Sequence, residues 1–198
     1  MHSCWIFPPE FNVPQIDIAF AISAEAFQSE ANFKEMKDTV KEFIEKFGVH
    51  GKVHHSLLTF GDPPTVYLKF SDKSSSSSAL TALIDGVPKP SKGTALAKAL
   101  NEAKMLFTPA AGSTANAKKI LVVMIDKESD SSKEDAQKAS RELDDEGIRV
   151  FAVALGDQDN LREVEAIVPT KENVIKPNDT DTPTDIANKI IDNMLNGK

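Results

Sequence analysis

The sequence predicts an α/β domain with a doubly wound, six-stranded and mostly parallel sheet, helices on both faces and one antiparallel strand at an edge. Two observations carry most of this prediction. Six consecutive apolar residues at 120–125 indicate a central parallel strand that is covered on both faces. Short apolar segments also alternate along the chain with helical patterns, which favours parallel strands joined by crossover helices.

The first half of the chain alternates these patterns in order. Residues 16–22 form a short apolar run and predict a buried strand, and 53–60 predict a second one. Between them, apolar side chains at 33–47 recur every three or four residues, which predicts an amphipathic helix. After a turn, strict alternation at 65–70 predicts the antiparallel edge strand. The apolar residues of that strand, expected on one face, are Val66, Leu68 and Phe70.

The second half adds the remaining helices and strands. Thr94 is placed near the N-cap of one helix, and Pro183 lies in the first turn of the last one, where proline is favoured. Apolar runs that end at glycine or at an acidic residue predict the strands. The expected helices are 80–84, 94–107, 133–146, 159–168 and 182–194, and the expected strands are 118–126, 148–155 and 174–175.

Length and composition fit one folded domain. The chain has 198 residues, of which 40% are hydrophobic, and these can form a sizeable core. No run of eighteen apolar residues occurs, so we expect no membrane insertion. Residues 1–11 lack the pattern of a secretory signal peptide, so the chain is either cytosolic or a piece of a larger precursor. We expect 1–13 to be an N-terminal extension and 14–198 to be the domain.

Charge and motifs narrow the classes of function. The net charge of −7 argues against nucleic acid and anionic membranes as partners, and it favours cations or basic protein surfaces. The chain lacks a nucleophile elbow, a zinc-protease motif and a phosphate loop, so no catalytic residue is predicted. His54 and His55 are adjacent in a strand, so their side chains should point to opposite faces and cannot share a metal.

Polar residues follow the expected strands at the edge where ligands bind in such sheets. Ser23 and Glu25 come after the first strand, and Asp126 follows the long central strand. Thr94 opens a helix between them in the sequence. Ligands sit outside the carboxyl ends of parallel strands where the strand order reverses, so these four residues are candidates to meet. Their hard oxygen atoms are the ligands that Mg²⁺ or Ca²⁺ accepts.

Six segments together resemble the von Willebrand factor type A (vWA) domain family, over about residues 14–196. The resemblance implies a Rossmann-like fold. It also implies a protein-binding module, because such domains occur mostly in extracellular adhesion and matrix proteins. The segments that carry it, in the family's order and spacing, are 16–22, 30–33, 58–62, 92–100, 120–126 and 147–156.

Many members of that family bind a partner through a divalent cation, held at a metal-ion-dependent adhesion site. Its motif is Asp-x-Ser-x-Ser after the first strand, a Thr in a middle loop and an Asp after the fourth strand. The resemblance matches Thr94 and Asp126 to the last two positions. In the first part, however, Ser23 stands in place of the Asp, and Glu25 and Phe27 in place of the two Ser. Phe27 has no atom that can bind a metal, so the site is expected to be degenerate.

We therefore predict a non-enzymatic module for protein binding and cell adhesion, part of a larger secreted multidomain protein of the extracellular matrix. Its partner would be collagen or another matrix protein, bound without a strong metal. Lys127 could pair with Glu25 or Asp126 and so replace the cation. The alternatives are a calcium- or mineral-associated matrix protein, a weakened Mg²⁺ or Ca²⁺ site, and a cytoplasmic scaffold domain of the same fold. The predicted binding residues are Ser23, Glu25, Thr94, Asp126 and Lys127, and the degenerate metal set is the same without Lys127.

Two further sequence features bear on the compartment. Family members often pair a cysteine before the first strand with one after the last helix, and Cys4 fits the first of these positions. A free cytosolic thiol is the alternative. Asn178-Asp179-Thr180 forms an N-glycosylation sequon in an expected surface loop.

Overall fold

A computed structural model describes the chain over residues 15–23, 30–48, 52–72, 76–89, 95–126, 132–155 and 161–196. These residues form a six-stranded sheet in the order β3-β2-β1-β4-β5-β6, in which β3 is antiparallel to β2 and every other neighbouring pair is parallel. The predicted fold class is therefore confirmed. The strands are β1 (Ile16–Ser23), β2 (Val53–Phe60), β3 (Thr65–Leu68), β4 (Lys118–Ile125), β5 (Ile148–Ala154) and β6 (Val174–Ile175).

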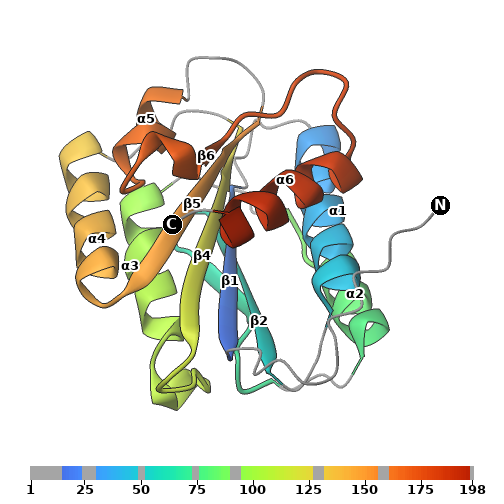
Figure 1. Ribbon diagram of the computed structural model, residues 1–198, viewed down its shortest axis with the longest axis horizontal. Helices are drawn as coiled ribbons and strands as arrows, with labels where there is room; N and C mark the ends of the chain where they lie inside the picture. The colour runs from blue at the N-terminus through green and yellow to red at the C-terminus, as the bar shows by residue number, and fades with distance from the viewer. Residues whose placement is uncertain are drawn as a thin grey trace.

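Helices cover both faces of the sheet (Figure 1). On one side, α1, α2 and α6 bury Phe33, Phe43 and Ile186 against one face of the strands. On the other side, α3, α4 and α5 pack against the opposite face. The helices are α1 (Glu30–Phe47), α2 (Ser77–Asp85), α3 (Leu96–Leu106), α4 (Lys133–Asp145), α5 (Leu161–Ala166) and α6 (Pro183–Asn196). In the described part of the chain, none of them is long and apolar enough to cross a membrane.

The strand order reverses between β1 and β4. From β1 the chain moves outward to β2 and β3, then returns to place β4 on the other side of β1 and continues outward. The two central strands are in parallel register, with Ile22 beside Met124 near their carboxyl ends. In a doubly wound sheet, such a reversal opens a crevice at the carboxyl edge.

One prediction about the edge strand is wrong. Leu68 lies in the same core cluster as α1, whereas Val66 and Phe70 pack against the cluster on the other face of the sheet. The pairing of β2 with β3 shifts by one residue between Leu57 and Leu58, so two steps along β3 match one step along β2. Such a bulge turns the following side chain to the opposite face.

The two adjacent histidines of β2 lie on opposite faces, as their positions predict. His55 is buried against Phe43, and its Nε2 contacts the carbonyl oxygen of Gly48 at 2.9 Å. Gly48 ends α1 with a φ of 87°, a left-handed conformation that glycine adopts readily. His54 projects to the other face, where its Nδ1 lies 2.9 Å from Oδ1 of Asp17.

Asp17 anchors the amino end of the sheet. Its carboxylate is completely buried, yet it has several partners. Oδ1 contacts His54, and Oδ2 accepts hydrogen bonds from the Ser113 hydroxyl at 2.8 Å and from the Thr114 backbone N–H at 2.7 Å. A buried carboxylate is stable when donors surround it in this way, so Asp17 fastens the segment that leads into β4 to β1 and β2.

Candidate functional site

The candidate site lies at the carboxyl edge of the sheet, where the strand order reverses. Ser23 is the last residue of β1, and Asp126 directly follows β4. Because β1 and β4 are parallel neighbours, both residues lie at the same end of the sheet. The structure thus brings these two predicted residues to one edge. Glu25, Thr94 and Lys127, together with Phe27, lie outside the described residues.

Buried polar atoms without hydrogen-bond partners among the described residues occur at this edge, and they occur elsewhere at Oγ1 of Thr39 and Nδ1 of His55. Ser23 is fully buried and Asp126 is 4% exposed. Among the described residues, neither Oγ of Ser23 nor Oδ1 of Asp126 has a hydrogen-bond partner, and the same holds for Oγ1 of Thr59 near the end of β2. A buried polar atom left without a partner is unfavourable by about 1–3 kcal/mol. Such atoms are rare in folded proteins, and they require an explanation such as a ligand or an ordered water.

A further residue of this edge, Asn32, was not among the predicted site residues. Its side-chain Nδ2 donates a hydrogen bond of 3.3 Å to Oδ2 of Asp126. Asn32 lies in the first turn of α1, the helix that follows β1, so α1 helps to orient the carboxylate. The position of Asn32 in the sequence is the signal that could have indicated it, because a polar residue at the start of a crossover helix faces the carboxyl edge of the sheet.

The described residues offer few metal ligands at this edge. Within the part of the chain that the structure describes, no group of three or more His, Cys, Asp or Glu side chains is placed to hold a metal ion. Of the residues that the structure describes, this edge provides one carboxylate, from Asp126, and neutral hydroxyls. These groups are suited to hydrogen bonding with a polar or basic group, and by themselves they would give a hard cation only part of its coordination shell.

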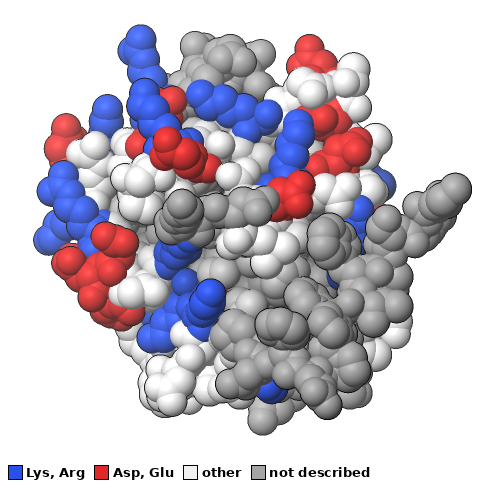
Figure 2. Space-filling model, viewed as in Figure 1, with Lys and Arg blue, Asp and Glu red and all other residues white. Residues whose placement is uncertain are grey.

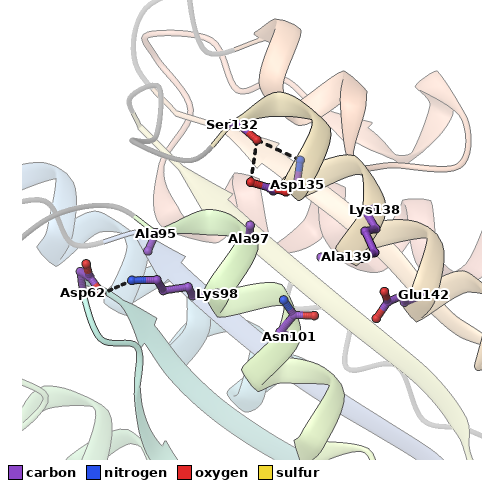
Figure 3. Close-up of a pocket in the computed structure, with 10 residues that line it drawn as sticks. All are labelled: Asp62, Ala95, Ala97, Lys98, Asn101, Ser132, Asp135, Lys138, Ala139 and Glu142. Atoms are coloured by element: carbon purple, nitrogen blue, oxygen red, sulfur yellow. Dashed lines mark hydrogen bonds and ion pairs between the residues drawn. The ribbon is translucent and has the colours of Figure 1, made fainter.

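A groove of about 450 Å³ lies beside this edge, between α3 and α4 (Figure 3). The turn after β2 reaches it through Asp62, which forms a 2.8 Å ion pair with Lys98 of α3. Ser132 caps α4 by accepting a hydrogen bond from the Asp135 backbone N–H and donating one to its carboxylate. The groove is lined by small and charged side chains, namely Asp62, Ala95, Ala97, Lys98, Asn101, Ser132, Asp135, Lys138, Ala139 and Glu142.

The charges of the groove are locally balanced. Lys104 donates a 2.7 Å hydrogen bond to Glu142, and this contact lowers the pKa of the Glu142 carboxyl. Lys98 and Asp62 form a second pair, so these positive and negative charges largely cancel within the groove. Exposed pairs of this kind add little to the free energy of unfolding.

The fold and the matched sequence identify the family. A model of the von Willebrand factor type A domain matches residues 17–189. The chain belongs to this family. Among curated proteins, this vWA domain is 28% identical over 185 residues to the mouse (Mus musculus) collagen alpha-5(VI) chain and 27% identical over 161 residues to the mouse collagen alpha-4(VI) chain. These matches cover 91% and 81% of the domain's chain, but it spans 7% of the length of each collagen chain.

Solved structures share the fold. Proximal thread matrix protein 1 from the mussel byssus superposes with a TM-score of 0.82 at 22% identity, covering 91% of this chain and 48% of the mussel chain. Another structure of the mussel protein is described as having a zinc-occupied metal-ion-dependent adhesion site. Manganese-loaded TRAP protein of Plasmodium vivax superposes with a TM-score of 0.70 at 14% identity, covering 89% and 74% of the two chains. At these identities the likeness shows the fold.

Proposed function

We propose that this vWA domain is a non-enzymatic protein-binding module of an extracellular matrix or adhesion protein. Its binding surface would be the carboxyl edge of the sheet, formed by Ser23 and Asp126 with Glu25, Thr94 and Lys127 from the neighbouring loops. The observation that carries the proposal is that Oγ of Ser23 and Oδ1 of Asp126, buried at the reversal of strand order, have no hydrogen-bond partner among the described residues. A polar or basic group of a partner protein would give these oxygens the hydrogen bonds they lack.

The collagen VI relatives support a setting in the matrix, and collagen or another matrix protein is the proposed class of partner. The domain would act as one part of a longer, secreted protein, with residues 1–13 as an extension that precedes it. On the face shown in Figure 2, described basic and acidic side chains are interspersed. This mixed surface suits a protein partner better than nucleic acid, which a continuous basic surface would favour.

The residues of this chain fit a strongly bound Mg²⁺ or Ca²⁺ poorly. Asn32 directs an amide N–H at Oδ2 of Asp126, so that lone pair is engaged by a donor. Ser23 offers a neutral hydroxyl where the family's motif has a carboxylate. Magnesium requires near-octahedral oxygen ligands, and each missing ligand weakens its binding. We therefore propose a degenerate metal site and recognition that needs no tightly bound ion, with Ser23, Glu25, Thr94 and Asp126 as the ligands of any weak cation.

Metal titration tests the degenerate site. Calorimetry of the wild-type domain with Mg²⁺ and with Ca²⁺ is expected to give no sub-millimolar binding. The double variant Ser23→Asp/Phe27→Ser restores two oxygen ligands of the family's motif and should bind Mg²⁺ at least tenfold more tightly, or by about 1.4 kcal/mol. The proposal would be contradicted by sub-millimolar binding to the wild type that Asp126→Ala abolishes.

A binding assay tests the surface itself. Immobilised fibrillar collagen is the probe, and bound domain is measured with and without a chelator. Asp126→Ala should weaken binding at least tenfold, or by about 1.4 kcal/mol, because it removes the acceptor at the edge. Asp144→Ala, at the opposite end of α4, is the matched control and should bind like the wild type. Complete loss of binding in chelator would overturn the metal-independent mode, and equal binding by both variants would exclude this edge as the binding surface.

A further inference from the structure

The turn between β6 and α6 presents three consecutive polar residues to solvent. Asn178, Asp179 and Thr180 are all exposed, and they form the single Asn-x-Ser/Thr triplet of the sequence. The middle residue is not proline, which would block modification. A loop that is exposed in the folded protein can carry a large polar group without disturbing the core.

Hydrogen bonds hold this turn in one shape. The side-chain Oδ1 of Asn178 accepts bonds from the Thr180 backbone N–H at 3.0 Å and from the Thr180 hydroxyl at 2.6 Å. The Asn178 backbone N–H donates to Oδ2 of Asp181 at 2.8 Å. Lys189 of α6 pairs with Asp181 and ties the turn to the helix. The Asn178 side chain is therefore positioned at the surface by its own neighbours.

The amide nitrogen of Asn178 keeps a hydrogen available in this arrangement. Nδ2 donates to Oδ1 of Asp181 at 3.1 Å. That bond uses one of the two amide hydrogens. Replacing the other hydrogen by a sugar leaves the bond to Asp181 in place, so the folded turn is compatible with a glycosylated asparagine.

We infer that Asn178 is the acceptor of an N-linked glycan. In the transfer, Nδ2 forms a bond to the anomeric carbon of an oligosaccharide carried on a lipid pyrophosphate. The bond between that carbon and the phosphate oxygen breaks, the lipid pyrophosphate leaves, and Nδ2 loses one proton. This inference rests on the proposed function, because the donor lipid is met in the secretory pathway.

A glycan at this position would restrict how a partner reaches the candidate site. β6 is parallel to β5, so the turn that follows it lies at the carboxyl edge of the sheet, the same edge as Ser23 and Asp126. β5 separates β6 from β4 in the sheet. The glycan would shield that flank and leave the side formed by β2 and α3 open, where the groove lies.

Expression of the full chain behind a cleavable secretion signal in animal cells tests the inference. In gel electrophoresis, the wild-type protein should migrate more slowly than a protein of its calculated mass. An amidase that removes N-linked glycans should restore the expected mobility. The same treatment should convert Asn178 to Asp, which mass spectrometry detects. Asn178→Gln and Thr180→Ala should remove the modification completely. Thr180→Ser preserves the triplet and should retain it, and Asn193→Gln is the matched control outside the triplet.

The outcomes separate this inference from the proposed function. Secreted wild-type protein without a glycan at Asn178 overturns the inference, whatever its binding to collagen. A glycosylated protein that does not bind collagen leaves the inference standing and counts against the proposed function. Because the signal sequence imposes the secretory route, the result does not depend on the natural compartment. Thermal unfolding of the amidase-treated protein and the variants confirms that each one is folded.

Discussion

Replacing Gly112 with alanine is expected to lower the free energy of unfolding by about 3 kcal/mol or more. Gly112 has a φ of 89°, in the left-handed region that disfavours other residues. A Cβ atom there would lie 2.3 Å from the backbone nitrogen of Ser71 and 2.8 Å from the carbonyl carbon of Phe70. Both are backbone atoms, so no side-chain rotation can relieve the overlap. The substitution would separate these segments and break the 2.9 Å hydrogen bond from the Ser71 N–H to the carbonyl of Ala111.

Gly147→Ala is the matched control for this prediction. Gly147 also has a left-handed φ, of 72°, but no atom of the described residues beyond its chain neighbours lies within 4 Å of the position of an added Cβ. It should therefore lose only the conformational preference, about 1–2 kcal/mol. Urea unfolding of both variants measures the difference. Equal losses would mean that the close approach of 112 to the segment after β3 is not maintained in solution.

Acidification is expected to destabilise the domain through His55. The pKa of His55 lies at about 4, below its ordinary value of 6.5. Burial is the main cause of this lowering, the hydrogen bond to Gly48 opposes it, and the neighbouring His54 adds to it. Between pH 6.5 and 4 the unfolded chain binds a proton at this residue and the folded chain does not. The free energy of unfolding therefore falls as the pH falls through this window, by about 3 kcal/mol in total.

Urea unfolding at a series of pH values between 7 and 4 measures this loss. The variant His55→Gln keeps a polar side chain but cannot bind the proton. Between pH 6.5 and 4, its free energy of unfolding should therefore fall by about 3 kcal/mol less than that of the wild type. Below pH 4, further loss of stability has a different origin. Hydrogen bonds lower the pKa values of Asp181 and Asp185 below 3.8, so the stability that these carboxylates contribute is lost as they are protonated at lower pH. Identical slopes for the wild type and His55→Gln between pH 6.5 and 4 would show that His55 is not buried in its neutral form.

Most of the fold could be predicted because each element has a strong local pattern. The apolar run at 120–125 can bury all of its side chains only in a central strand that is covered on both faces. The apolar stripe at 33–47 can be buried only if it belongs to a helix that covers the sheet. The face of Leu68 could not be predicted in this way. A bulge depends on how two strands pair, and a one-residue shift is invisible in the alternation of a single strand.

The candidate site was predictable only in part. Ser23 and Asp126 could be placed at one edge because parallel neighbouring strands end together. For Asn32 the sequence offers only its position at the start of a crossover helix, and this is a weak signal because an amide in the first turn of a helix is most often solvated. Its contact with Asp126 spans 94 positions, so no local pattern indicates it. The roles of Glu25, Thr94 and Lys127 remain predictions.

The opposite ends of β1 use their polar side chains in opposite ways. At its beginning, Asp17 is contacted by three groups from two segments, His54 of β2 and the adjacent Ser113 and Thr114, so a change there would loosen the junction of β1, β2 and the approach to β4. At its end, Ser23 makes no such bond to the described residues, so the framework does not depend on its hydroxyl. The two ends of one strand therefore differ in how much of the surrounding framework a substitution would disturb. Exchanging the carboxylate at the amino end would leave three donors without their acceptor, whereas exchanging the hydroxyl at the carboxyl end removes no contact to the described residues.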